Sequence, residues 1–199
     1  KSSKKDTFLY RNLPDFELIS LQEKEFTAPI KIVYAGLLGV AQGIFKICTQ
    51  IAFPSTIEFH IYGAGPEASR IKSIENQQIQ YHGEVSREQL HRVLVTYDVA
   101  FIPLVNRIYG SVPSKIFEYT RLGLPVLYYA GGEGGDLVNK YELGWTVPVN
   151  NNKALQEFID TFSEKKLAEY SKKDVQQKAI NAFDFGKQFD LFLKKISTL

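Results

Sequence analysis

One short segment holds the residues best able to take part in chemistry. Ser111 suits the cap of a helix, and Pro113 suits the first turn of that helix. Free backbone amides at this point, together with the hydroxyls of Ser111 and Ser114 and the ammonium of Lys115, would converge on an anion. Glu118 lies about one turn further along, where its carboxylate can accept two hydrogen bonds from the cis-diol of a ribose. The alternative is an exposed i, i+3 pair between Lys115 and Glu118, worth only about 0.2–0.5 kcal/mol.

Glycines follow two of the expected strands. Gly36, Gly39 and Gly43 precede a helical stretch, where a bare backbone can approach a ligand and a helix start favours an anion. Their spacing differs from the dinucleotide fingerprint G-x-G-x-x-G, so this segment is either a diphosphate cradle or a tight turn. Gly63 and Gly65 follow the next strand and could form a floor for a flat ring.

The three histidines give weaker signals. His82 stands at the end of a strand beside Tyr81, where a loop residue is a more common explanation than a catalyst. His60 lies inside a strand and is expected to be structural, and His91 is expected on a helical surface without a role. The glycine-rich stretch 131–135 could close over a ligand or could be a simple flexible turn.

Composition and motifs exclude several classes of protein. The chain has 199 residues and a net charge of +2, which gives no electrostatic case for a nucleic-acid partner. Cys48 is the only cysteine and lies in an apolar helical stretch, so we expect a buried thiol and no disulfide. We find no HExxH pattern, no paired aspartates, no histidine cluster, no Walker sequence and no nucleophile elbow. Neither a metal site nor a serine hydrolase is expected.

The chain shows no sign of membrane insertion. No run approaches the roughly 20 apolar residues that span a bilayer, and no signal-peptide pattern is present. We therefore expect a cytoplasmic location, with membrane association only through a longer protein. The first residues are polar and include no initiator methionine, so we expect a piece of a longer chain.

These residues must be positioned by alternating strands and helices. Apolar β-rich runs occur at 30–35, 57–62, 79–81, 99–102, 125–129 and 145–147. Helical stretches between them fall at about 43–53, 66–75, 86–95, 113–122 and 134–141. This alternation predicts an α/β protein with a doubly wound, Rossmann-like, mainly parallel sheet of about six strands. Ligands bind such sheets at the carboxyl ends of the strands, which is where the glycines and polar residues lie.

The two ends of the chain flank this pattern. Residues 1–28 are expected to form an interdomain linker, with a turn at 12–15, and residues 29–199 to form the domain. From residue 150 onward, amphipathic spacing predicts two or three helices, the last capped by Asp184.

The order of these features resembles the C-terminal domain of the retaining GT-B glycosyltransferases of family four, especially bacterial capsule and exopolysaccharide enzymes. The resemblance covers nearly the whole chain, and its strength is the joint order of its motifs rather than any single one. The matching segments are 34–36 with 41–43, 59–67, 81–83, 97–103, 112–119, 122–127 and 144–145, with 11–15 similar to the interdomain connection.

The resemblance implies a UDP- or GDP-sugar donor, a glycan or lipid-linked acceptor, transfer with retention and no metal requirement. It places the base beside four residues, the ribose at Glu118 and the diphosphate at a helix start and a glycine loop. The implied base-binding residues are Gly63, Gly65, Tyr81 and His82, and the implied diphosphate-binding residues are Ser111, Ser114, Lys115, Gly39 and Gly43.

The sequence departs from the family pattern in two places. Gly110 occupies the position of a carboxylate that the family often carries near the donor sugar. The glycine loop that often carries Arg and Lys here offers Leu37, Leu38 and Gln42. Lys115 and Arg107 could supply the missing positive charge.

A complete enzyme of this type has two Rossmann-like halves with the active site between them. We therefore expect this chain to supply the donor-binding half, to bind nucleotide weakly and to transfer no sugar alone. The alternatives are another GT-B enzyme such as a nucleotide-sugar epimerase, a non-catalytic nucleotide-binding or interaction module, and a flavodoxin-like signalling domain.

Overall fold

A single parallel sheet organises the protein. The computed structural model describes residues 7–21, 27–105 and 112–197. Its six strands run in the order β3-β2-β1-β4-β5-β6, and every neighbouring pair is parallel. The strands are β1 (Ile30–Ala35), β2 (Ile57–Tyr62), β3 (Ile79–Gly83), β4 (Val99–Leu104), β5 (Val126–Ala130) and β6 (Gly144–Val147). The predicted doubly wound, six-stranded sheet is confirmed.

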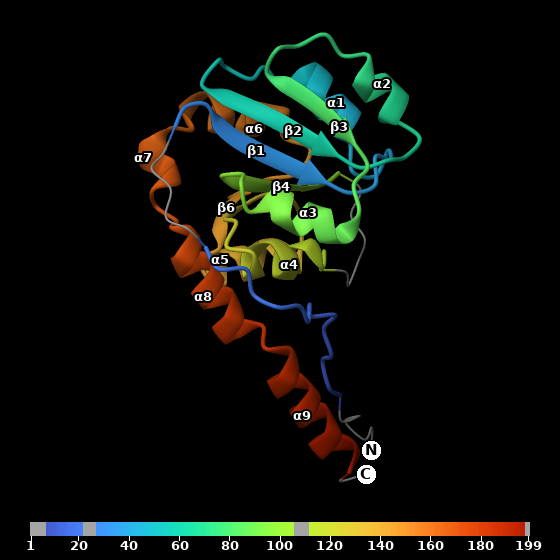
Figure 1. Ribbon diagram of the computed structural model, residues 1–199, viewed down its shortest axis with the longest axis vertical. Coiled ribbons are helices and arrows are strands. Elements are labelled where there is room, and N and C mark those ends of the chain that lie inside the picture. Colours follow the sequence, from blue (N-terminus) through green and yellow to red (C-terminus); the bar gives the residue numbers. More distant parts are fainter. Residues whose placement is uncertain (1–6, 22–26, 106–111, 198–199) are drawn as a thin grey trace, which may run out of the picture.

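Helices cover both faces of the sheet (Figure 1). One face packs against α1 (Ile44–Gln50), α2 (Ala68–Lys72) and α6 (Asn152–Thr161), and the short α7 (Glu164–Leu167) follows α6. The other face packs against α3 (Arg87–Leu94), α4 (Lys115–Arg121), α5 (Glu133–Lys140) and α8 (Lys172–Ala182). Parallel strands need such crossovers, and the helices then bury both faces.

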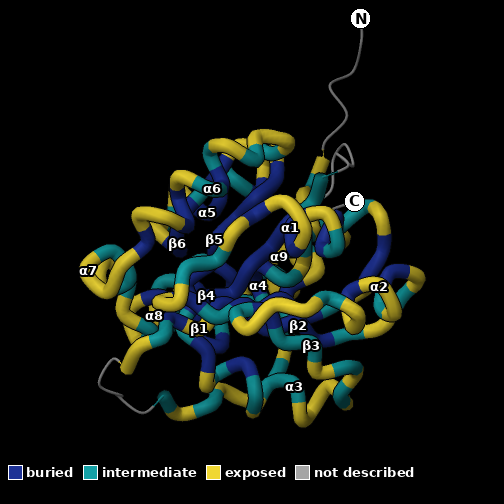
Figure 2. Tube along the Cα trace, turned by 90° about the horizontal axis from the view of Figure 1, so that it is seen from above, coloured by how far each residue is buried: buried dark blue, intermediate teal, exposed yellow. Residues whose placement is uncertain are grey.

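The strands read as continuous apolar runs because both of their faces are buried. In β5 every residue is buried, and alternate side chains enter the two cores: Leu127 and Tyr129 on one side, Val126 and Tyr128 on the other. Figure 2 shows the central strands in dark blue, with exposed positions along the outer sides of the helices. Successive side chains of a strand point to opposite faces of the sheet, so every second residue packs against the same layer of helices.

The C-terminal part differs in detail from the expectation. Four helices, α6 to α9, follow β6 within the described residues, where two or three were expected. Asp184 caps α9 (Phe185–Ile196) as predicted, since its side chain accepts a hydrogen bond from the Lys187 amide at 3.0 Å. The glycine stretch 131–135 is not wholly a loop, because α5 begins at Glu133 and its Gly134 packs closely on Tyr128.

The described N-terminal residues 7–21 contain no helix or strand, and they pack against the domain. Leu13 is buried in the core on the α4 side of the sheet. Arg11 exchanges two backbone hydrogen bonds with the Gln188 side chain, at 2.9 and 2.7 Å, which holds this segment beside α9. α9 itself extends away from the sheet and buries none of its residues (Figure 1).

Candidate functional site

The strand order reverses between β1 and β4, which makes a crevice at their carboxyl ends. β1 pairs with β2 on one side and with β4 on the other. The chain leaves β1 and β2 toward α1 and α2 on one face, and leaves β3 and β4 toward α3 and α4 on the other. Ligands of doubly wound sheets bind at this switch point.

Glycines allow the loops after β1 and β2 to touch backbone to backbone. The Leu38 amide donates to the Ala64 carbonyl at 2.8 Å, and the Glu67 amide donates to the Leu38 carbonyl at 3.0 Å. A Cβ on Gly63 would overlap the Gly36 carbonyl, and a Cβ on Gly65 would overlap the Leu38 backbone. Both glycines also have positive φ, of 131° and 152°. Their type is therefore explained by this close approach.

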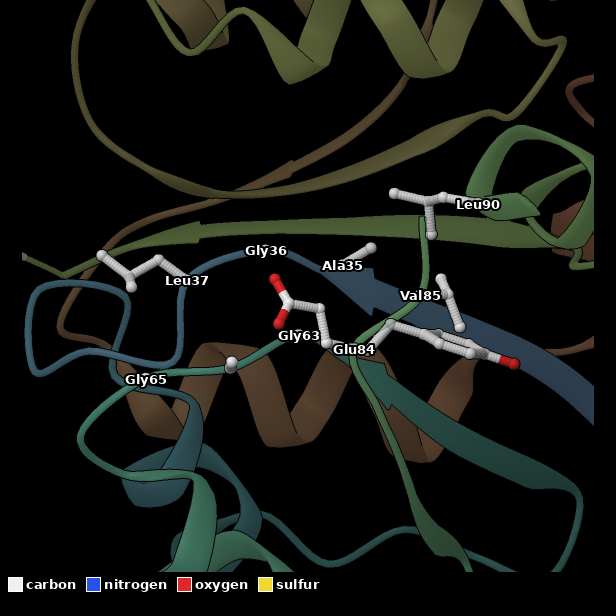
Figure 3. Close-up of a pocket in the computed structure, with 10 residues that line it drawn as sticks. Ala35, Gly36, Leu37, Gly63, Gly65, Glu84, Val85 and Leu90 are labelled. Carbon is white, nitrogen blue, oxygen red and sulfur yellow. The ribbon is translucent and has the colours of Figure 1, made fainter. Parts of the chain in front are cut away.

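A hollow of about 540 Å³ lies above these loops, within the usual size of a small-molecule site. Figure 3 shows it between the ends of β1, β2 and β3, with Glu84, Val85 and Leu90 on one side and Leu37 on the other. Its lining residues are Ala35, Gly36, Leu37, Tyr62, Gly63, Ala64, Gly65, Glu84, Val85 and Leu90. The structure thus places the predicted Gly63 and Gly65 in the wall of one cavity.

Lys115 lies directly beneath this wall. Its ammonium donates to the carbonyl of Ala35, the last residue of β1, and fills the space that a side chain on Gly36 would need. Tyr119 donates to the same carbonyl at 2.8 Å. Burial lowers the pKa of Lys115 to about 8, although the nearby Glu118 carboxylate acts in the opposite direction. Lys115 is therefore not part of an exposed surface pair with Glu118, and that alternative is wrong.

Glu118 faces α3 and pairs with a histidine. Its Oε1 lies 2.7 Å from Nε2 of His91, and the two side chains are only 19% and 14% exposed. The ring of Phe16 packs on His91, with the ring centres 4.6 Å apart. The expectation that His91 lies on an open helical surface is wrong, because α3 and α4 cover the same face of the sheet and leave its side chain largely covered.

Tyr81 and His82 contact residues that line the hollow and are absent from its described lining. The Tyr81 hydroxyl donates to the Gly63 carbonyl at 2.9 Å. His82 stacks on Tyr62 with ring centres 4.5 Å apart, and its Nε2 lies 2.9 Å from Nδ1 of His60. His60 is buried and also contacts Glu58, so its expected structural role is confirmed.

Gly39, Gly43 and Ser114, which were also predicted to contact the diphosphate, are absent from the described lining of the hollow. Gly39 and Gly43 form a hydrogen-bonded turn, in which the Gly43 amide donates to the Gly39 carbonyl at 3.4 Å. A Cβ on Gly43 would meet the side chain of Val105, which explains this glycine by packing. Ser114 precedes α4 and is exposed, with no capping hydrogen bond from its side chain. Arg107, Gly110 and Ser111 lie outside the described residues.

Residues 30–165 match the family described as "Glycosyl transferases group 1". This span is more than half of the 199-residue chain. The chain belongs to this family. The stretch contains all six strands and both sides of the hollow, so the family pattern and the candidate site coincide in this glycosyltransferase domain.

Two curated relatives from bacteria are named as glycosyltransferases. WbjE of Pseudomonas aeruginosa is 27% identical over 144 residues, which covers 68% of this chain and 36% of that protein. WcaL of Escherichia coli K12, named for colanic acid biosynthesis, is 23% identical over 175 residues, covering 77% of this chain and 43% of that protein. The glycosyltransferase domain thus spans less than half the length of either relative.

A solved structure agrees with the observed fold. HepE of Anabaena, crystallised with UDP, superimposes with a TM-score of 0.69 at 17% identity, covering 86% of this chain and 50% of that chain. At this identity the similarity establishes the fold of the glycosyltransferase domain. Among the described residues, no helix has the length and apolar character needed to cross a membrane.

Several residues that line the hollow were not predicted from the sequence. Leu37, Val85 and Leu90 line the hollow, as does Glu84. Glu84 follows β3 directly, so its position at a strand end was a usable signal. The apolar residues carried no such signal, because single leucines and valines at partly exposed positions are common in loops and helices.

Proposed function

We propose that this domain binds the UDP- or GDP-sugar donor of a glycosyltransferase that transfers a sugar to a glycan or lipid-linked acceptor. The chain belongs to the Glycosyl transferases group 1 family, and its relative WcaL is named for the biosynthesis of a polysaccharide. We place the reaction in bacterial surface-polysaccharide assembly on that ground.

One observation carries the proposal. The hollow, the buried ammonium of Lys115 and the carboxylate of Glu118 lie together at the switch point of the sheet. The hollow is walled by glycine backbone and apolar side chains, which suits a planar base. Leu90 lines the hollow and is followed in α3 by His91, the partner of Glu118. A base in the hollow would therefore leave its ribose near Glu118.

The charges at the site suit the rest of a nucleoside diphosphate. Glu118 accepts one hydrogen bond from His91, and its carboxylate has further lone pairs for a ribose hydroxyl. Lys115 would supply positive charge to the diphosphate from beneath Gly36. Ser111, Ser114 and the Gly39–Gly43 turn remain our proposed additional phosphate contacts, and we propose that the donor binds without a metal ion.

The acceptor would bind to a second domain. The matched part of this chain covers only 36% of one curated relative and 43% of the other. Donor and acceptor must meet for transfer, and the site proposed in this domain would bind only the donor. We therefore propose that the 199-residue chain binds nucleotide and transfers no sugar by itself.

Calorimetric titration with nucleoside diphosphates and their sugar conjugates tests this function. We expect binding of a nucleoside diphosphate, and we expect Glu118→Ala to weaken it by about 1–3 kcal/mol, the scale of a lost hydrogen bond to a charged group. Glu157→Ala is the matched control, since Glu157 is an exposed carboxylate on α6 on the opposite face of the sheet.

Three results would count against the proposal. If no nucleoside diphosphate binds, the result would favour a non-catalytic interaction module. Equal losses in Glu118→Ala and Glu157→Ala would remove the ribose role of Glu118. Sugar transfer by the isolated chain would contradict the need for a second domain.

A further inference from the structure

The hollow has a very uneven distribution of polar groups. Eight of its ten described lining residues are apolar or glycine. The ninth, Tyr62, uses its hydroxyl in a buried hydrogen bond of 2.9 Å with the Tyr97 hydroxyl. The tenth, Glu84, is the one lining residue with a charged side chain.

Two backbone carbonyls of the lining already accept hydrogen bonds from side chains. The Ala35 carbonyl accepts from Lys115 and Tyr119, and the Gly63 carbonyl accepts from Tyr81. A ring bound in the hollow would therefore find its strongest acceptor in the carboxylate of Glu84.

Glu84 is placed to reach such a ring. It follows β3 directly and is exposed at the rim of the hollow. Figure 3 shows its carboxylate directed over the hollow toward Gly36 and Gly63. No hydrogen bond or ion pair joins Glu84 to another of the residues described in this structure. Its two oxygens are thus available to a ligand.

A carboxylate discriminates among nucleobases by the donors on their edges. Guanine presents two adjacent donors, N1–H and the 2-amino group, which match the two oxygens of a carboxylate as the fork of Arg does. Uracil presents one N–H between two carbonyl oxygens, which a carboxylate repels. Adenine places its amino group beside an acceptor nitrogen, and hypoxanthine keeps N1–H but lacks the 2-amino group.

We propose that Glu84 makes this site selective for a guanine nucleotide, so that the donor is a GDP-sugar. The inference rests on the proposed function, because it assumes that a nucleoside diphosphate occupies the hollow. Val85 and Leu90 would contact the ring, and Glu84 would accept its two N–H donors.

Calorimetry with GDP, IDP, UDP and ADP on the 199-residue chain tests the selectivity. We expect GDP to bind at least about tenfold more tightly than UDP or ADP, and IDP to fall between them. Glu84→Gln should weaken GDP binding about tenfold and should leave UDP binding within about twofold, because only guanine uses both carboxylate oxygens.

Glu88→Gln is the control, since it removes the same charge from an exposed position in the first turn of α3 outside the lining of the hollow. A GDP preference that disappears in Glu84→Gln and persists in Glu88→Gln supports the proposal. Equal binding of GDP and UDP, or a GDP preference that survives Glu84→Gln, overturns the selectivity and leaves donor binding intact. Binding of none of the four nucleotides overturns the proposed function itself.

Discussion

Nε2 of His91 lies 2.7 Å from Oε1 of Glu118, and this contact joins α3 to α4 across the edge of the candidate site. Both side chains are largely buried, and Phe16 packs on the histidine ring. A carboxylate held in this way keeps one orientation, which favours binding of a ribose diol because less side-chain freedom is lost. We therefore propose that His91 positions the Glu118 carboxylate.

Replacing His91 tests this positioning role. We expect His91→Ala to weaken nucleoside diphosphate binding about threefold to tenfold, because Glu118 loses the donor that orients it. His91→Gln should restore most of the affinity, since its amide N–H can donate in place of Nε2. Calorimetry on the three proteins provides the measurement.

A double-mutant cycle separates positioning from general damage. If His91 acts through Glu118, then His91→Ala should cost little additional affinity when Glu118→Ala is already present. Losses that add in the double variant would refute the positioning role. Thermal unfolding of each variant checks that the fold persists.

Much of the fold could be predicted from local patterns. The runs at 30–35, 57–62 and 99–102 match β1, β2 and most of β4, because fully buried parallel strands are continuous in apolar residues. The alternation with helical stretches then fixes the class and the layers. The helix predicted at about 134–141 matches α5 to within one residue, and the contact of Gly134 with Tyr128 explains a glycine inside its first turn.

The site could be predicted only in part, because its contacts join residues distant in sequence. Lys115 was identified from its place in the first turn of a helix, but its burial against Ala35 depends on how α4 lies across β1. The His91–Glu118 contact spans 27 residues and depends on the packing of α3 beside α4. No local periodicity encodes such a pairing, and a histidine in a polar helix resembles an ordinary surface residue.

The lowered pKa of Lys115 predicts a pH dependence of nucleotide binding. With a pKa of about 8, the ammonium loses its proton as the pH rises through that value. The diphosphate prefers the charged form, so affinity should be nearly constant at about pH 7 and should fall by up to tenfold per pH unit above about pH 8. Calorimetric titration from about pH 7 to about pH 9.5 checks this.

Lys115→Met is the informative comparison for the pH profile. Its affinity should be lower at neutral pH and should not change across the same range, because no charge is left to titrate. Tyr119 still donates to the Ala35 carbonyl in this variant, so no buried acceptor is left unpaired. A wild-type profile that is flat through pH 8, or a profile that persists in Lys115→Met, would show that another group controls binding.

Two glycines near the hollow should differ sharply in their tolerance of a methyl group. Gly63→Ala places Cβ on the Gly36 carbonyl and strains a backbone with φ of 131°, so we expect a loss of about 2–4 kcal/mol in the free energy of unfolding. Gly83→Ala meets no atom within 4 Å, and only its φ of 77° opposes the substitution. Its cost should therefore be about 1–2 kcal/mol.

Urea denaturation of the two variants measures this difference, and nucleotide titration connects it to the site. Gly63→Ala must push apart the loops after β1 and β2, which together wall the hollow, so it should weaken nucleotide binding as well as the fold. Gly83→Ala should leave binding largely unchanged, because Gly83 is absent from the described lining. A similar loss in the free energy of unfolding for the two variants would mean that the loops can separate at little cost. The close approach of Gly36 and Gly63 would then not determine the shape of the hollow.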